Sequence, residues 1–322
     1  MKGKYKVRIQ NSAVRFTFEI ERNVNIIRGN SGTGKTTLID MVVDYQAEGK
    51  ASGVEVVCDK PCVAMSRLGQ NWQNFLSGVS DSIVFIDEGE RYVSSKAFAE
   101  FITKSDNYFV IATRNNLYNI PYSVDAVFEI KSSGKYGELR QTYNHFNKIY
   151  LNEINKNIRF TDNKSVITED SKSGYEFFDA VSEIYGLDCR SCQGKSNIVS
   201  YLSEFGKSKA LVVADGAAFG PEMANVCSIV DGSNISLFLP ESFEWLILKS
   251  GLIKDNKLRE IIKRPYDYTD STEYSSWEQY FTMLLIELTK DTQYKYNKSN
   301  INPYYTSKKS VKSILGDYFE DL

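Results

Sequence analysis

Apolar and polar positions alternate at the start of the chain and give way to short apolar runs further on. Residues 5–9 and 14–20 alternate on either side of a turn at Asn11-Ser12, which predicts an antiparallel hairpin. Beyond the hairpin, apolar runs typical of buried strands take turns with segments of helical periodicity. This order predicts an α/β domain with a mostly parallel sheet. The expected strands are 24–27, 54–58, 62–65, 83–86, 108–112 and 126–130, and the expected helices start at 38 and cover 66–79 and 97–102.

The alternation stops in a polar stretch, residues 131–163, that is rich in Lys, Asn and Tyr. We interpret it as a helical connector, because strands and helices resume directly after it. The sequence thus predicts two α/β domains: residues 1–135, then a connector over 136–163, then residues 164–322 with a helical, Lys/Tyr-rich C-terminal extension. In the second domain the expected strands are 166–168, 188–192, 210–214 and 235–239, and the expected helices are 175–185, 198–205, 243–248 and 277–289.

A glycine-rich loop lies between the strand at 24–27 and the helix that follows it. Its sequence matches G-x-x-x-x-G-K-[ST], the phosphate-binding P-loop, in the required strand–loop–helix context. Glycines let successive backbone N–H groups point at phosphate oxygens, and the helix start adds its positive dipole end. We expect Lys35 to bridge the β- and γ-phosphates of ATP and Thr36 to ligate Mg²⁺. The residues predicted to contact nucleotide are Gly29, Asn30, Ser31, Gly32, Thr33, Gly34, Lys35, Thr36, Thr37 and Arg114.

Two acids follow the buried strand at 83–86. Asp87 is predicted to hold Mg²⁺ through water, and Glu88 to act as general base toward the attacking water. The carboxyl ends of such strands form the ligand crevice of an α/β sheet. Arg114 follows the strand at 108–112, where it is placed to sense the γ-phosphate, and Arg91 is a weaker candidate for a finger acting across subunits.

The first domain resembles ABC-type ATPases. The resemblance covers residues 1–130 and includes the antiparallel N-terminal ribbon, the segment RGNSGTGKTTLID and the Asp87-Glu88 pair. It implies an ATPase with ATP and Mg²⁺ as ligands. Only a short segment separates Lys35 from Ile86, so the domain is a reduced version of that fold.

Acidic residues also end strands in the second domain. Glu169 follows the strand at 166–168, and Asp215 follows the strand at 210–214. Ala217 lies two positions after Asp215, and Glu241 and Glu244 head the helix at 243–248.

This order of strand ends resembles the Toprim fold of topoisomerases, primases and OLD-family nucleases. That family binds Mg²⁺ for phosphodiester chemistry with a glutamate and an Asp-x-Asp pair, which Glu169 and Asp215 match in part. Ala217 stands where the second aspartate belongs, and we expect Glu244 to supply a carboxylate in its place. The resemblance implies an ATP-gated, Mg²⁺-dependent nuclease, in bacterial or phage-borne defence against phage, with Glu169 and Asp215 catalytic and Lys195 near phosphate.

The amino-acid composition limits the possible partners and metal sites. The 39 basic and 41 acidic side chains give a net charge of −2, so any contact with DNA or tRNA must be local. A single histidine, His145, excludes HExxH and paired-histidine metal sites. Five cysteines in a chain of 322 residues are not typical of a disulfide framework, and zinc bound by Cys58, Cys62, Cys189 and Cys192 is disfavoured. Without a signal-peptide or membrane-spanning pattern, a cytoplasmic protein is expected.

Partners and alternative functions stay open at this stage. The C-terminal lysines, interleaved with Tyr294, Tyr296, Tyr304 and Tyr305, are candidates for contacting nucleic-acid phosphates, with the rings stacking on bases. The alternative is a non-nucleolytic switch: ATP binding would order a homo-oligomer whose degenerate Toprim-like domain binds a regulatory protein. Ala217 favours this alternative. A small P-loop kinase is disfavoured, because such kinases carry a lid with clustered arginines.

Overall fold

The computed structural model describes residues 1–66, 69–136, 141–150, 158–205 and 208–322. The chain is an α/β protein that divides into two compact units. Unit 1 comprises Met1–Ile149 and Tyr266–Ser275, and unit 2 comprises Tyr150–Pro265 and Ser276–Leu322. The predicted boundaries at 135 and 164 differ from this division. Within the described residues, no helix combines the length and the apolar character needed to cross a membrane.

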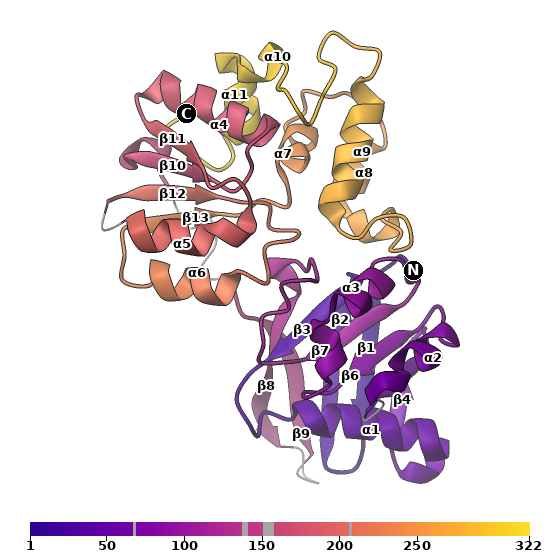
Figure 1. The fold of residues 1–322 in the computed structure, drawn as a ribbon. Coiled ribbons are helices and arrows are strands. Elements are labelled where there is room, and N and C mark those ends of the chain that lie inside the picture. The colour runs from indigo at the N-terminus through magenta and orange to yellow at the C-terminus, as the bar shows by residue number, and fades with distance from the viewer. Residues whose placement is uncertain (67–68, 137–140, 151–157, 206–207) are drawn as a thin grey trace. The chain divides into compact units, whose positions relative to one another are not determined.

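Unit 1 is built on a sheet of nine described strands in the order β4-β1-β2-β9-β8-β3-β7-β6-β5 (Figure 1). The predicted hairpin is confirmed, since β1 and β2 pair antiparallel. The strands β8, β3, β7, β6 and β5 run parallel to one another, so the sheet is mixed. The strands are β1 (Tyr5–Gln10), β2 (Val14–Ile20), β3 (Val24–Arg28), β4 (Glu55–Val57), β5 (Cys62–Met65), β6 (Ile83–Ile86), β7 (Tyr108–Ala112), β8 (Val127–Tyr136) and β9 (Thr142–Lys148).

Successive residues of a strand point to opposite faces of a sheet. Neighbouring residues of β7 show that both faces of this sheet are covered. Val110 of β7 belongs to the core cluster that α1 closes with Leu38 and Val42. The neighbouring Phe109 packs edge-on against Phe98 of α3 on the other face. The α-helices of unit 1 are α1 (Lys35–Glu48), α2 (Trp72–Ser77) and α3 (Lys96–Ile102).

The predicted helical connector is wrong where the structure describes it as a strand. Residues 142–148 form β9, which pairs antiparallel with β8 and parallel with β2. Phe146 anchors it, stacking on Phe18 of β2 with ring centroids 3.9 Å apart. Since β9 carries one phenylalanine among polar residues, it lacks the apolar run by which buried strands are recognised. Residues 137–140 and 151–157 of the predicted connector lie outside the described residues.

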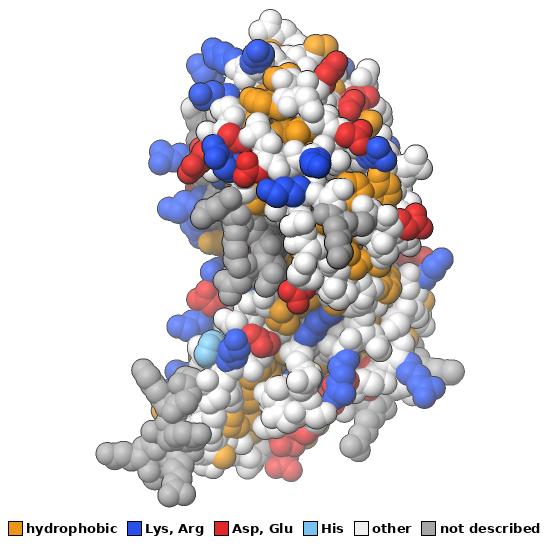
Figure 2. Space-filling view, turned by 90° about the vertical axis from the view of Figure 1, so that its left-hand side faces the viewer, with side chains coloured by type: hydrophobic (Ala, Val, Ile, Leu, Met, Phe, Trp, Pro, Cys, Tyr) orange, Lys and Arg blue, Asp and Glu red, His pale blue; other side chains and the backbone are white. Residues whose placement is uncertain are grey.

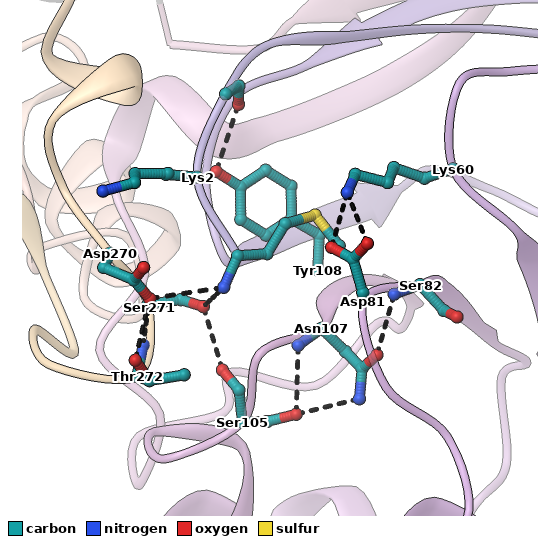
Figure 3. Close-up of polar contacts among 12 residues, drawn as sticks. Lys2, Lys60, Asp81, Ser82, Ser105, Asn107, Tyr108, Asp270, Ser271 and Thr272 are labelled. Carbon is teal, nitrogen blue, oxygen red and sulfur yellow. Dashed lines mark hydrogen bonds and ion pairs between the residues drawn. The ribbon is translucent and has the colours of Figure 1, made fainter.

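A late segment of the chain, Tyr266–Ser275, belongs to unit 1 and packs beside its N-terminal residues (Figure 3). The Ser271 hydroxyl donates to the carbonyl oxygen of Ser105 at 2.9 Å. It also accepts a hydrogen bond from the amino nitrogen of Met1 at 2.8 Å. The Gly3 N–H donates to the Tyr266 carbonyl oxygen at 2.7 Å. These backbone and hydroxyl contacts bind a polar segment that carries no strand or helix pattern.

Unit 2 contains a four-stranded parallel sheet in the order β11-β10-β12-β13, with helices on both faces (Figure 1). From β10 the chain moves to β11 on one side and then returns to β12 on the other. The direction therefore reverses between β10 and β12, which makes their carboxyl ends the expected ligand crevice. The elements are β10 (Ser165–Thr168), α4 (Ser173–Tyr185), β11 (Asp188–Ser191), α5 (Lys195–Phe205), β12 (Ala210–Val213), α6 (Met223–Val230), β13 (Ile235–Phe238), α7 (Phe243–Lys249), α8 (Leu258–Lys263), α9 (Trp277–Thr289), α10 (Pro303–Thr306) and α11 (Lys308–Leu315).

Candidate functional sites

The glycine-rich loop of unit 1 joins β3 to α1 and curls around the side chain of Lys35. Gly29, Gly32 and Gly34 have φ angles of 138°, 83° and 92°, which side chains with a Cβ rarely adopt. The Lys35 ammonium donates to the carbonyl oxygens of Gly29 at 2.6 Å and Asn30 at 3.0 Å. Lys35 is 5% exposed. The loop therefore holds a buried positive charge at the start of a helix, an arrangement suited to phosphate.

A cavity of about 740 Å³ opens beside this loop. Thr36 of α1 and Asp87 and Glu88, which follow β6, line it together. A hydroxyl and carboxylates are the oxygen ligands that Mg²⁺ prefers, so the residues present fit this ion. Arg91 also lines the cavity.

Arg114 links the loop to the acids. Because β7 lies between β3 and β6, the residues after β7 emerge between the loop and Asp87-Glu88. The Arg114 guanidinium contacts Glu88 Oε1 at 2.6 Å and donates to Ser31 Oγ at 2.7 Å. Glu88 Oε2 lies 3.8 Å from the Lys35 ammonium. The predicted base is thus flanked by two cations, and the residues predicted as a nucleotide site are brought together.

Unit 2 brings its predicted acids together at the carboxyl ends of β10 and β12. Glu169 and Asp215 line one small cavity of about 180 Å³. Asp215 Oδ1 accepts the Phe243 N–H at the start of α7 at 3.0 Å. This backbone contact fixes the Asp215 carboxylate at the point where the strand order reverses.

Glu244, the third predicted acid, lies in the same cavity and is 2% exposed. Its Oε1 accepts a hydrogen bond from the buried Tyr296 hydroxyl at 2.8 Å, and that hydroxyl lies 2.7 Å from Ser173 Oγ. Its Oε2 has no hydrogen-bond partner among the described residues. A buried carboxylate oxygen without a partner is costly, and it marks a position that a cation would satisfy.

Further charged residues surround this site, and the sequence did not single out Glu278 or Glu222 among them. Glu278 of α9 and Lys298 line the cavity, and their charged groups form an ion pair at 2.8 Å. Burial raises the pKa of Glu169, and the carboxylates of Glu278 and the buried Glu222 add to that shift. Ala217, which stands where the second aspartate of the Toprim pattern belongs, is 3% exposed and lies in the core. It contributes no carboxylate to the site.

The proximity of these acids shows in their proton affinities. Burial and then the carboxylates of Glu278, Glu244 and Glu169 raise the pKa of Asp215 well above its ordinary value. Burial likewise raises the pKa of Glu169 to about 7, although Lys195 opposes the shift. Carboxyl groups that resist ionisation together favour a bound cation. The described part of the chain nevertheless holds no three His, Cys, Asp or Glu side chains already arranged around one metal position.

The assignment of the two candidate sites is based on the residues and geometry of this chain alone. No family model, curated protein or solved structure matches this chain. The resemblances to ABC-type ATPases and to the Toprim fold therefore stay predictions.

Asp170 illustrates a carboxylate with a purely local role. It lines the same cavity as Glu169, but both its oxygens accept backbone N–H groups at the start of α4, from Ser171 at 2.7 Å and from Gly174 at 2.9 Å. A Cβ at Gly174 would come within 2.8 Å of Asp170 Oδ2, so a larger residue there would displace the Asp170 carboxylate. Asp170 thus stabilises the start of α4, and both its oxygens already accept hydrogen bonds, in contrast to Glu244 Oε2.

Two of the four C-terminal tyrosines, Tyr296 and Tyr305, are 2% and 0% exposed, so the prediction that their rings stack on bases is wrong. Both rings pack within unit 2, where Tyr305 donates to the Tyr294 carbonyl oxygen. On the face shown in Figure 2, Lys and Arg side chains are interspersed with acids, and the single histidine, His145, is exposed. All five cysteines are free thiols.

The raised pKa of Glu169 predicts a pH-dependent stability. The group titrates near 7 in the folded protein and near 4.5 in the unfolded chain. Its contribution to stability is therefore fully present below pH 4.5 and is lost as pH rises through 7. We expect the metal-free protein to lose on the order of 3 kcal/mol of unfolding free energy from this group between pH 5 and pH 8. Urea unfolding at the two pH values measures the loss.

Glu169→Gln, which cannot ionise, should flatten this pH dependence and stabilise the metal-free protein at pH 8. Glu183→Gln, at an exposed position of α4, is the matched control and should leave the dependence unchanged. An equally steep dependence in Glu169→Gln and wild type would contradict the assigned environment of Glu169.

Proposed function

We propose that unit 1 binds Mg²⁺-ATP and hydrolyses ATP. The observation that carries this proposal is the buried Lys35 ammonium inside a loop of left-handed glycines, next to a cavity shared by Thr36, Asp87 and Glu88. Thr36 and Asp87 would hold Mg²⁺, which supplies charge neutralisation of the phosphates. Glu88 would accept the proton of the attacking water, and Arg114 would move from Glu88 toward the γ-phosphate.

Binding of a fluorescent ATP analogue in the presence of Mg²⁺ tests the proposal. Lys35→Ala removes the charge that faces the phosphates, and we expect at least about a tenfold loss of affinity. Lys50→Ala is the matched control, since Lys50 is an exposed lysine just after α1. Equal binding by wild type and Lys35→Ala would contradict the assignment.

Unit 2 is proposed to be a divalent-cation-dependent enzyme that cleaves phosphodiesters, controlled by the nucleotide state of unit 1. The buried, unpartnered Oε2 of Glu244, in one cavity with Glu169 and Asp215, supports a cation site. Glu169, Asp215 and Glu244 would hold the cation, which activates water and polarises the phosphate. Control by unit 1 is supported by the path of the chain, because Tyr266–Ser275 belongs to unit 1 and continues into α9, which carries Glu278.

Incubation of the protein with plasmid, single-stranded DNA and tRNA, with Mg²⁺ or Mn²⁺ and with or without ATP, tests this second activity. Metal-dependent cutting is the expected result. The buried Ala217 favours the alternative, an ATP-dependent oligomeric switch that binds a regulatory protein. A nucleotide-dependent change in oligomer size without cutting of any substrate would decide for the switch. A role in defence against phage rests on the resemblance alone and is part of the proposal.

A further inference from the structure

The acidic cavity of unit 2 contains its own cation. Glu169, Asp215, Glu244 and Glu278 line it from four different segments of the chain. Carboxylates confined to a space of about 180 Å³ repel one another and destabilise the fold unless a positive charge lies among them. The described residue that brings such a charge into the lining is Lys298.

The contacts of Lys298 are uneven. Its ammonium lies 2.8 Å from Glu278 Oε1 but 4.0 Å from Glu244 Oε1. Glu244 Oε1 is held by Tyr296, and Oε2 has no partner among the described residues. Lys298 thus offsets part of the negative charge of the cavity and leaves its most buried carboxylate, Glu244, without a close cationic partner.

The backbone of Lys298 is fixed while its side chain can move. The Lys298 carbonyl oxygen accepts the Ser173 N–H at the start of α4 at 3.2 Å. The side chain is 39% exposed, and its ammonium stands at the end of a flexible four-carbon stem. The ammonium can therefore leave the carboxylates without any change in the path of the chain.

We propose that Lys298 is a tethered counter-ion that occupies the acidic cavity at rest and that a divalent cation must displace. The ammonium and the cation compete for the negative charge of one cavity, and Glu244 is the proposed cation ligand that the ammonium also faces, so the bound ammonium lowers the apparent affinity for metal. This inference rests on the cation site of the proposed function. Lys298 does not bind the metal in this proposal. Its competing charge sets the metal concentration at which the site fills.

Calorimetric titration of the full chain with Mn²⁺ alone tests the proposal. We expect Lys298→Met to bind Mn²⁺ about tenfold more tightly than wild type, because the competing charge is gone. Lys298→Arg keeps the charge and should restore the weaker binding, which a merely structural role of the side chain does not predict. Lys290→Met is the matched control, because Lys290 pairs with Glu287 on an exposed part of the same extension, and its affinity should equal that of wild type.

The outcomes separate the inference from the function on which it rests. Equal or weaker Mn²⁺ binding by Lys298→Met, with binding by wild type intact, overturns the counter-ion role alone. Absence of binding in wild type and in Lys298→Met overturns the cation site itself. If Lys298→Met does not fold without metal, Lys298→Gln replaces it in the same titration, and Mn²⁺ should then raise its melting temperature more than that of wild type.

Discussion

Glu88→Gln is expected to slow ATP hydrolysis by about 10²- to 10⁴-fold while leaving ATP binding intact. The amide cannot accept the proton of the attacking water. Its oxygen can still accept from Arg114, whose guanidinium lies 2.6 Å from Glu88 Oε1, so the geometry of the site is preserved. Phosphate release under saturating ATP measures the rate, and binding of the fluorescent analogue measures the affinity.

The matched control for this variant is Glu90→Gln. Glu90 lines the same cavity as Glu88, but it is not predicted to act as a base, and its substitution should change the rate by less than about threefold. Removal of the Glu88 charge near the γ-phosphate should, if anything, tighten ATP binding. A wild-type rate in Glu88→Gln would show that another group activates the water, and the assignment of Glu88 would then be wrong.

Both candidate sites have a lysine among carboxylates. In unit 1, Lys35 lies 3.8 Å from Glu88, which also contacts Arg114. In unit 2, Lys298 pairs with Glu278 beside Glu244. The ligands proposed for the two sites, the phosphates of ATP and a divalent cation, are charged. Their binding would replace the Lys35–Glu88 and Lys298–Glu278 ion pairs. Such replacement makes binding depend on salt and on the state of the internal partner.

The loop and the strand ends can be predicted from the sequence because their signals are local. The predicted role of Gly29, Gly34 and Lys35 depends on a backbone shape that nine consecutive residues determine. Asp87, Glu169 and Asp215 each follow an apolar run, and the carboxyl ends of parallel strands meet at one edge of a sheet. Glu169, Asp215 and Glu244 line one cavity, although the described side chains are not arranged around a single metal position.

The residues that close the second site give no local signal. Glu278 lies on α9, whose sequence is typical of an apolar packing helix, and it reaches the cavity because α9 packs on α7. Lys298 comes from a polar stretch that resembles a solvated surface. The segment Tyr266–Ser275 likewise joins unit 1 through contacts with residues far away in the chain. Such placements depend on tertiary packing, which periodicity along the sequence does not report.

Asp215→Asn is expected to reduce metal-dependent phosphodiester cleavage by at least about 10²-fold and to abolish detectable Mn²⁺ binding. The amide oxygen can still accept the Phe243 N–H that now bonds to Oδ1 at 3.0 Å. Because burial and neighbouring acids already disfavour the ionised form of Asp215, as its raised pKa shows, the neutral side chain should leave the metal-free protein at least as stable as wild type. Loss of activity would then not result from unfolding.

Asp170→Asn supplies the contrast in the same cavity. Its carboxylate accepts backbone N–H groups from Ser171 and Gly174, so the substitution should lower the unfolding free energy by about 1 kcal/mol and leave Mn²⁺ affinity within a few-fold of wild type. Calorimetric Mn²⁺ titration and urea unfolding of both variants separate the two roles. If Asp215→Asn bound Mn²⁺ like wild type while Asp170→Asn lost it, the helix cap and the cation ligand would have been assigned the wrong way round. A loss in neither variant would remove both carboxylates from the cation site, and with them the case for metal-dependent chemistry in unit 2.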